Sequence, residues 1–553
     1  MVAVVKPSVP PLFKMSIFLK IKPDFVYCFR RNIVKHIANI TFDNVIYSSN
    51  NFSKNGYSTN ISGKETIPDN KTAQFIKFDD MIEEGRKVAQ RSYVVQVNSE
   101  NSCIELHDYC QSICTVENMF YYRVKDDHFV LVEFSNSEAA HKLSFDPNNL
   151  AVVSPFIWFR TGKKKKLVPS SVNVSPLINI SQGPTELEII EWMTVAQSLL
   201  DEMEILYQST KLSQLGFKLR MICARQVEMM LSGLFPNIRA FPFGSTVNSF
   251  GKEGCDLDLV LRYNFSQENS DDLRLVHHSK INGISSRGQT QRQMELLGDL
   301  LQIYVPGVIG VKRILGARVP IIKYSHEFTG VDVDISLTNM SAMYMSELLY
   351  IFAHLDPAAQ RLVFSIKAWA KVVGLTNPSP GRWITNFSLT LLVLFYLQNE
   401  RRLPSIDDLF KLAGPNDTRY AEEINCSFIR DLRNVRLELD HSKTTAELLL
   451  GFFNFYQNFD FNNKAISLCS AKIINKLDYS PMYIVNPLDR NLNVTKNVSL
   501  EEVERIRVEA RNAAWALETS SRLVDLFRSS PESLMSKRKY ISRMVMVKDL
   551  FQT

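Results

Sequence analysis

A Gly-Ser turn followed closely by two aspartates could support metal-dependent chemistry on phosphates. The run FPFGS, which ends in Gly244 and Ser245, is followed after ten residues by DLDLVL, which contains Asp256 and Asp258. The apolar alternation predicts a strand, and the period of two along a strand places both aspartates on one face, close enough to bridge metal ions. The glycine lets the backbone approach a phosphate, and the serine offers that phosphate a hydroxyl and an N–H.

A second acidic strand is predicted further along the chain. The run VDVDISL, residues 331–337, alternates in the same way and carries Asp332 and Asp334 on one face. A single pair of strand aspartates occurs often by chance. The turn, the first pair and the later strand together favour a catalytic site built from Asp256, Asp258 and Asp334.

These segments resemble the DNA polymerase β-type nucleotidyltransferase superfamily, in its noncanonical poly(A) and poly(U) polymerase branch. The resemblance spans about residues 190–510 and implies template-independent addition of nucleotides to the 3′ end of RNA. It also implies that Asp256 and Asp258 bind two divalent ions, Mg²⁺ or Mn²⁺, and that Asp334 joins them at the catalytic ion and accepts the proton of the RNA hydroxyl. Asp332 competes for this role, but only Asp334 stands in the family's hydrophobic-Asp-hydrophobic-Ser pattern.

Two further motifs of this family have counterparts that would contact the nucleoside triphosphate. The run SIKAWAK, residues 365–371, resembles the helix whose two lysines meet the triphosphate, here Lys367 and Lys371. Like charges four residues apart on a helix repel each other unless an anion lies between them. The family's Ser-Tyr, whose ring stacks on the incoming base, is replaced by Asn386 and Phe387. Phe387 is a candidate for base stacking and equally for the core of an apolar helix.

The chain resembles the PAP-associated region of the same family nearer its C-terminus. Residues 448–461 match that region, and residues 486–499 resemble its nucleotide-recognition motif, with Asn486 and Asn493 available to contact the base. The usual aspartate of this motif is Asn486 here. In related uridylyltransferases a histidine near this motif contacts the base, and the last of the nine histidines of this chain is His441. We therefore expect ATP to be preferred over UTP.

The expected fold is α+β, with a nucleotidyltransferase palm of mixed sheet and helices, a helical PAP-associated central domain and an N-terminal module. The order β-α-β-β-α over residues 93–143 gives the module its resemblance to an RNA-recognition motif (RRM). The predicted domains are a leader (1–60), the RRM-like module (61–165), a linker (166–185), helices leading into the central domain (186–215), the palm (216–342), the central domain (343–540) and a tail (541–553).

The RRM-like module lacks the features that would let its sheet stack on RNA. The run DHFVLVEF, residues 127–134, has an acid where the RNA-contacting motif has a base, and it has no glycine. Its apolar strands need covering, so we expect the module to join two copies into a homodimer, as the family resemblance also implies. The four lysines at 163–166 are typical of a solvated linker but could also touch phosphate.

The overall composition is that of a folded protein, and the first sixty residues differ from it. An apolar content of 45% and a charged content of 22% exclude disordered and fibrous classes. The longest apolar run, residues 389–397, is too short to cross a bilayer, and the eight scattered cysteines favour free thiols. The leader has eight Lys or Arg against two acids, which favours a transit peptide over a disordered basic arm. With this leader the resemblance is nearest to mitochondrial poly(A) polymerases, which implies the mitochondrial matrix.

Two other kinds of function remain open at this point. A uridylyltransferase or a tRNA-end-repairing enzyme of the same fold would share every residue named above, so only the base-contacting positions distinguish it. A non-catalytic scaffold of this fold would be expected to have lost one of the three aspartates, and this chain keeps all three.

Overall fold

The chain divides into two compact units, residues 1–70 and 71–553, and every described residue belongs to the second. The computed structural model describes residues 75–137, 150–151, 156–158, 178–180, 183–235, 237–262, 286–377, 381–433 and 435–528. The predicted leader, most of the linker with its four lysines, and the tail lie outside these residues. Within them, no helix is both long and apolar enough to cross a membrane, and all seven described cysteines are free thiols.

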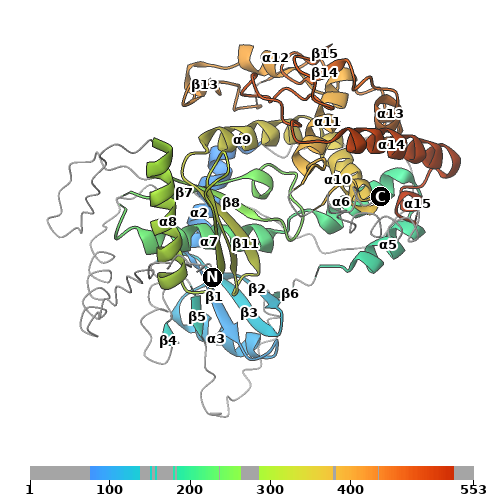
Figure 1. Cartoon of the computed structure of the whole chain (residues 1–553). Coiled ribbons are helices and arrows are strands. Elements are labelled where there is room, and N and C mark those ends of the chain that lie inside the picture. The colour runs from blue at the N-terminus through green and yellow to red at the C-terminus, as the bar shows by residue number, and fades with distance from the viewer. Residues whose placement is uncertain are drawn as a thin grey trace, which may run out of the picture. The chain divides into compact units, whose positions relative to one another are not determined.

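The palm is a five-stranded mixed sheet with the strand order β7-β8-β11-β10-β9. β8 and β11 run parallel, and the other neighbours are antiparallel. One face of the sheet is apolar and packs on α7 and α8, as Figure 1 shows for α8 along the sheet, so the opposite face is left for polar residues. The palm elements are α7 (Gln214–Leu231), β7 (Arg239–Phe243), η1 (Gly244–Thr246), β8 (Leu257–Arg262), α8 (Ser286–Tyr304), β9 (Val308–Ile314), β10 (Ile321–His326) and β11 (Val331–Ser336).

The central domain packs its helices around α11, which is buried on all sides. Every residue from 388 to 398 is buried, as expected for a helix that is apolar all round, and the Thr385 hydroxyl caps its start by accepting from the Ser388 N–H. The domain contains α5 (Glu186–Val195), α6 (Leu199–Thr210), α9 (Met340–Leu355), α10 (Pro357–Val372), α11 (Asn386–Asn399), α12 (Ile406–Lys411), η2 (Pro415–Asp417), β12 (Tyr420–Ala421), β13 (Ile424–Asn425), α13 (Thr445–Gln457), β14 (Lys464–Ser467), β15 (Lys472–Asn475), α14 (Leu500–Ser520) and α15 (Val524–Arg528).

Helices that precede the palm in sequence complete this central core. Ile189 and Met193 of α5 and Met203 and Leu206 of α6 are buried in the same apolar cluster as α10, α11 and α13. α5 also contacts α15, so segments from the two ends of the catalytic half lie side by side (Figure 1). Arg522, just before α15, makes a buried ion pair with Glu202 of α6 and so ties these ends together.

The RRM-like module forms a six-stranded sheet with the order β4-β5-β1-β3-β2-β6. β1 and β2 both pair antiparallel with β3, and α3 connects them, as the sequence order predicted. The predicted second helix of the module lies outside the described residues, apart from its first residue, and the RRM resemblance itself stays a prediction. The elements are α2 (Phe78–Gln90), β1 (Ser92–Val97), α3 (Ser102–Ile113), β2 (Val116–Val124), β3 (Asp127–Phe134), β4 (Leu150–Ala151), β5 (Phe156–Trp158) and β6 (Ile178–Ile180).

The same chain covers both faces of the central strands of this sheet. One face packs on α3, and the other, with Phe120 and Leu131, packs on Leu215 and Leu219 of α7 in the palm. The expectation that a second copy must cover these apolar strands was therefore wrong, because α7 of the same chain already covers them. The same packing leaves this face no room for RNA bases, in agreement with the missing RNA-contacting residues.

A buried ion-pair network fastens the RRM-like module to the palm. Glu133 of β3 is 2% exposed and pairs with Lys218 of α7 and, at 2.7 Å, with Arg91. Asn118 donates a further hydrogen bond to the Glu133 carboxylate at 3.1 Å. Burial opposes ionisation of Glu133, but the hydrogen bonds and charges of Lys218 and Arg91 outweigh burial and lower its pKa. The Glu133 carboxylate is therefore ionised and paired at neutral pH.

We predict that Glu133→Gln destabilises the protein by about 3 kcal/mol, because it leaves the buried ammonium of Lys218 without its counter-ion. The midpoint of urea unfolding, followed by circular dichroism, measures the loss. The matched control is Glu117→Gln, which removes the exposed partner of Arg91 and should cost less than about 1 kcal/mol. Equal midpoints for the two variants would contradict a role of Glu133 in holding the interface.

Candidate active site

Three carboxylates lie together on the polar face of the palm sheet. The parallel register of β8 and β11 sets Asp258 directly opposite Asp334, and Asp256 immediately precedes β8 on the same side as Asp258. Neighbouring strands are about 4.8 Å apart, so the side chains occupy one small area. The structure thus brings together the three aspartates that the sequence selected.

Mutual repulsion among these carboxylates makes the site electrostatically unfavourable without a cation. Burial, together with the charges of Asp334 and Asp256, raises the pKa of Asp258 to about 7. Reduced solvation and the charge of Asp334 also raise the pKa of Asp256. A positive charge placed among the three would favour their ionised forms.

Lys323 of β10 supplies a positive charge at this position. It lies opposite Asp334 in the antiparallel register of β10 and β11, and its ammonium donates a hydrogen bond to Oδ2 of Asp334. Burial opposes the charge on Lys323, but the hydrogen bond and attraction to Asp334 outweigh burial and raise its pKa. The sequence alone gave no role to this lysine, because its partner is set by strand register.

The carboxylates fit a hard divalent cation. Mg²⁺ and Mn²⁺ prefer carboxylate oxygens, and such an ion would relieve the repulsion that raises the pKa of Asp258. Across the residues that the structure describes, no three His, Cys, Asp or Glu side chains already converge as a ligand set. Asp334 is hydrogen-bonded to Lys323 in this arrangement. The ammonium of Lys323 therefore competes with a cation for Asp334.

Asp332 shares the face of Asp334 but has a different environment. Its carboxylate is exposed and accepts a hydrogen bond from the hydroxyl of Ser325 on β10. Asp334 is half-buried and lies opposite Asp258, whereas Asp332 lies two residues earlier on the strand, level with Asp256 and exposed. The geometry supports the choice of Asp334 as the third ligand.

The Gly-Ser turn is built around the carboxylate of Asp258. Gly244 has φ +72°, and a Cβ at this position would clash with Oδ2 of Asp258. Its N–H donates to the hydroxyl of Ser346 on α9 at 2.7 Å, which ties the turn to the central domain. Ser245 follows, half-buried, in η1. The sequence reasoning gave Gly244 a role toward phosphate, and the structure adds that only glycine leaves room for Asp258.

A buried arginine that the sequence reasoning missed orients the segment before Asp256. Arg220 of α7 is 3% exposed. Its Nε donates a hydrogen bond to the backbone carbonyl oxygen of Cys255 at 3.2 Å. The Thr246 hydroxyl donates to the carbonyl of Asp256 at 3.0 Å. A signal for Arg220 was present in the sequence: a charged residue within the otherwise apolar run LRMICA must find a buried partner.

The two predicted phosphate-binding lysines have different environments on α10. Lys367 is half-buried, donates to the carbonyl of Phe250 at 3.2 Å, and burial lowers its pKa to about 8. It therefore lies at the loop between the Gly-Ser turn and Asp256. Lys371, one turn later, is exposed and pairs with Glu186 of α5 at 2.5 Å. An anion beside Lys367 would stabilise its charged form.

The predicted base-contacting residues lie on two separate elements of the central domain. Asn386 is exposed in the first turn of α11, and Phe387 beside it is half-buried against the central core. The side-chain oxygen Oδ1 of Asn486 accepts hydrogen bonds from the backbone N–H groups of Leu488 and Asp489, both at 3.0 Å. Among the residues that the structure describes, no contact links Asn386, Phe387 or Asn486 to the aspartates, so the structure does not bring them into the cluster.

Asn493 makes four hydrogen bonds within its own loop. Its carbonyl oxygen accepts from the N–H groups of Ile484 and Thr495, and its amide nitrogen donates to the carbonyl of Met482 at 3.0 Å. The Thr495 hydroxyl adds a hydrogen bond at 2.9 Å. These contacts give Asn493 a loop-organising position, and a contact from its side chain to a base stays a prediction.

Comparison with known proteins finds similarity over most of the chain. Residues 199–354 match the central palm domain of mitochondrial-like poly(A) RNA polymerase, and residues 444–501 match the Cid1 family poly A polymerase domain. The mitochondrial poly(A) RNA polymerase of Drosophila melanogaster is 43% identical over 513 residues, which cover 86% of this chain and 84% of that protein. The Homo sapiens protein of the same name is 34% identical over a region that covers 80% of this chain and 77% of the human protein. A crystal structure of mtPAP in complex with ATPgammaS has a TM-score of 0.72 and 32% identity, covering 82% of this chain and 99% of that one.

The turn geometry predicts that Gly244→Ala weakens Mn²⁺ binding by about tenfold or more, because the new Cβ displaces the Asp258 carboxylate. Calorimetric titration of the protein with Mn²⁺ measures this affinity. Gly254→Ala is the matched control, since Gly254 has nearly the same backbone strain, φ +74°, but open space where a Cβ would lie. Equal losses in both variants would mean that backbone strain, and not the clash with Asp258, is responsible.

Proposed function

The chain belongs to the mitochondrial poly(A) RNA polymerase family, and on this premise we propose that Asp256, Asp258 and Asp334 are its catalytic carboxylates. Its activity is that of a polynucleotide adenylyltransferase, which transfers AMP from ATP to the 3′ end of RNA. The residue assignment rests on the strand register, which sets Asp258 opposite Asp334. The turn at Gly244 lies beside them and leaves room for the Asp258 carboxylate.

This fold uses divalent metal ions, and we assign Mg²⁺ or Mn²⁺ to the three aspartates. Such ions, when bound, lower the pKa of the primer hydroxyl and neutralise charge on the triphosphate. Asp334 accepts the proton of the 3′ hydroxyl, because it is half-buried opposite Asp258 and can exchange its hydrogen bond with Lys323. Arg220 and Thr246 hold the backbone on either side of Asp256 and so fix where its carboxylate lies.

The triphosphate is assigned to the side of the carboxylates formed by the Gly-Ser turn. Gly244 and Ser245 begin a short helical turn in which the N–H of Ser245 can face a phosphate oxygen, while the N–H of Gly244 is held by the Ser346 hydroxyl. Lys367 lies at the adjoining loop with a depressed pKa, so a phosphate there restores the full charge of its ammonium. Lys371 joins it once it leaves Glu186, an exposed ion pair of little intrinsic strength.

The adenine base is assigned to the start of α11 and the recognition loop. Phe387 offers a half-buried ring for stacking, and Asn386 and Asn486 offer amide groups. Solved structures of mtPAP include complexes with UTP, GTP and CTP as well as ATPgammaS. Occupancy of such a site by a triphosphate therefore does not define the preferred base, and turnover must be measured.

The enzyme is mitochondrial, as its relatives are named, and we place it in the matrix. The basic composition of the first sixty residues supports this placement. Localisation of the full chain carrying a C-terminal fluorescent tag, with a matrix marker and an outer-membrane marker, tests it. Signal outside the matrix would contradict the assignment.

We predict that the full chain is a homodimer through the RRM-like module. The covered sheet faces restrict the contact to the strand edges β4 and β6 and to the outer side of α3, since open strand edges pair readily with another chain. Sedimentation equilibrium at micromolar concentration measures the mass of the particle. A monomer mass of 63.3 kDa would contradict the prediction.

We predict that ATP is used with a kcat/KM at least about tenfold above that for UTP, which corresponds to about 1.4 kcal/mol of transition-state discrimination. This preference for ATP is expected because the sequence has no histidine within or after the nucleotide-recognition motif. The experiment is competition between the two triphosphates on one oligoadenylate primer with Mg²⁺. Equal use, or a preference for UTP, would overturn the adenylate assignment and leave the carboxylate assignment standing.

The same assay tests the carboxylates with two matched substitutions. Asp334→Ala should abolish extension while the unfolding midpoint stays near that of the wild type, because repulsion within the cluster is reduced. Asp332→Ala removes a carboxylate two residues away and should retain extension. The opposite pattern would transfer the third-ligand role to Asp332.

A further inference from the structure

A row of charged side chains crosses the polar face of the palm sheet and changes sign halfway. Strand register aligns Asp258 of β8, Asp334 of β11, Lys323 of β10 and Lys312 of β9, each directly opposite the next. Residues paired across strands project from the same face. The row therefore begins at the catalytic carboxylates and ends in two lysines at the edge of the sheet, since β9 is the outermost strand.

Lys312 belongs to the active face and not to the helix-covered one. The residues on either side of it, Val311 and Arg313, face α8: Val311 packs on the palm core, and Arg313 pairs with Asp299. Alternation along β9 sends Lys312 to the opposite face, where it is exposed. It has no ion-pair partner among the residues that the structure describes.

We propose that Lys323 and Lys312 form a track for the phosphates of the last nucleotides of the RNA, leading its 3′ hydroxyl to Asp334. This proposal rests on the proposed function, which makes RNA the substrate. Adjacent strands are about 4.8 Å apart, so Lys312 lies about 10 Å from Asp334, within reach of phosphates close to the 3′ end.

The position of the Gly-Ser turn decides which substrate the track receives. The turn follows β7, on the β8 side of the carboxylates, whereas both lysines lie on the other side, on β10 and β9. In-line phosphoryl transfer places the attacking and leaving oxygens on opposite sides of the phosphorus. With the triphosphate at the Gly-Ser turn, the attacking RNA hydroxyl enters from the side of Lys323 and Lys312.

Lys323 is suited to a change of partner during this entry. Its ammonium is satisfied by Asp334 in the present arrangement. When Asp334 turns to its catalytic role, the charge of Lys323 needs another anion, and a phosphate arriving along the row supplies one. The lysine is then a positioning residue, which orders the RNA end after releasing the catalytic carboxylate.

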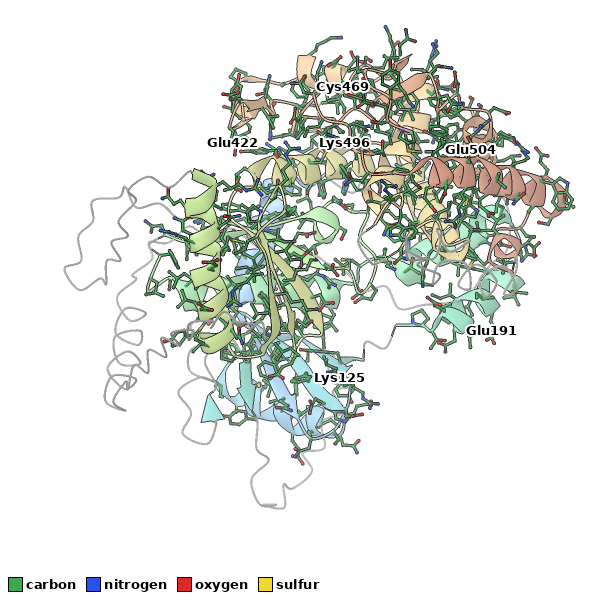
Figure 2. All side chains as sticks on the ribbon, in the orientation of Figure 1. Lys125, Glu191, Glu422, Cys469, Lys496 and Glu504 are labelled. Atoms are coloured by element: carbon green, nitrogen blue, oxygen red, sulfur yellow. The ribbon has the colours of Figure 1, made fainter. Side chains whose placement is uncertain are left out.

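The test compares RNA binding by the wild type, Lys312→Met and Lys125→Met. Lys125 lies on the β2–β3 turn of the RRM-like sheet, as labelled in Figure 2, and provides a charge-matched control on another sheet. Fluorescence anisotropy with labelled oligoadenylate, Mg²⁺ and no ATP, over a range of salt concentrations, gives Kd and its salt dependence. Lys312→Met should raise Kd about threefold or more and reduce the slope of log Kd against log salt by about 0.7, the amount for one phosphate on a single strand.

The KM for ATP separates this track from the triphosphate site. Lys312→Met should leave the KM for ATP within about twofold of the wild type. Lys323→Met should weaken RNA binding in the same way and also change Mn²⁺ affinity, because it frees Asp334. An RNA affinity of Lys312→Met equal to that of Lys125→Met, or a rise only in the KM for ATP, would overturn the track. A wild type that neither binds nor extends RNA would instead refute the proposed function.

Discussion

Repulsion among three crowded carboxylates is the constraint on which the rest of the site depends. Asp256, Asp258 and Asp334 sit on adjacent parallel strands, where burial and mutual charge raise the pKa of Asp258 to about 7. Folding alone would favour moving them apart. The surrounding chain prevents this, because Gly244 gives Asp258 its space and Lys323 provides Asp334 with a counter-ion. Gly244 and Lys323 thus keep the crowded carboxylates in place, in an arrangement that favours the binding of a cation.

The stability that tolerates this cluster comes from apolar packing behind it. The opposite face of the same strands is buried on α7 and α8, so the strand positions are fixed by a dry core while their polar face is free for chemistry. α7 has two sides with different partners. Its Leu219 and Lys218 face the RRM-like sheet, and Arg220 faces the loop before Asp256. The helix therefore couples the packing of the RRM-like module to the position of Asp256.

The elements of the palm could be predicted from sequence because strand alternation is a local property. The strands bearing Asp258 and Asp334 and the strands of the RRM-like module follow from it, and the helical period of apolar residues, also local, predicts the helix bearing the two lysines. Pairings that depend on register or on distant packing could not be predicted. The Lys323–Asp334 contact requires the alignment of β10 with β11, and the covering of the RRM-like sheet by α7 requires the tertiary fold. The hydrogen bonds that Asn493 makes within its own loop likewise depend on the folded loop and could not be predicted from the motif.

The hydrogen bonds of Asn493 within its own loop bear on how this motif could select a base. The hydrogen bonds that Asn493 makes to its loop cannot readily be exchanged for a base, since each exchange leaves a backbone group of the loop without a partner. The side chains of Asn493 and Asn486 therefore fix the shape of this loop and the directions of its backbone groups, Asn486 through its side-chain oxygen Oδ1. Specificity built on a rigid loop rejects a wrong base by leaving buried polar groups unpaired, which discriminates more strongly than a difference in size. On the proposed assignment, the asparagines of this motif affect the choice of nucleotide through the backbone they hold, and Phe387 at the start of α11 is the ring proposed for base stacking.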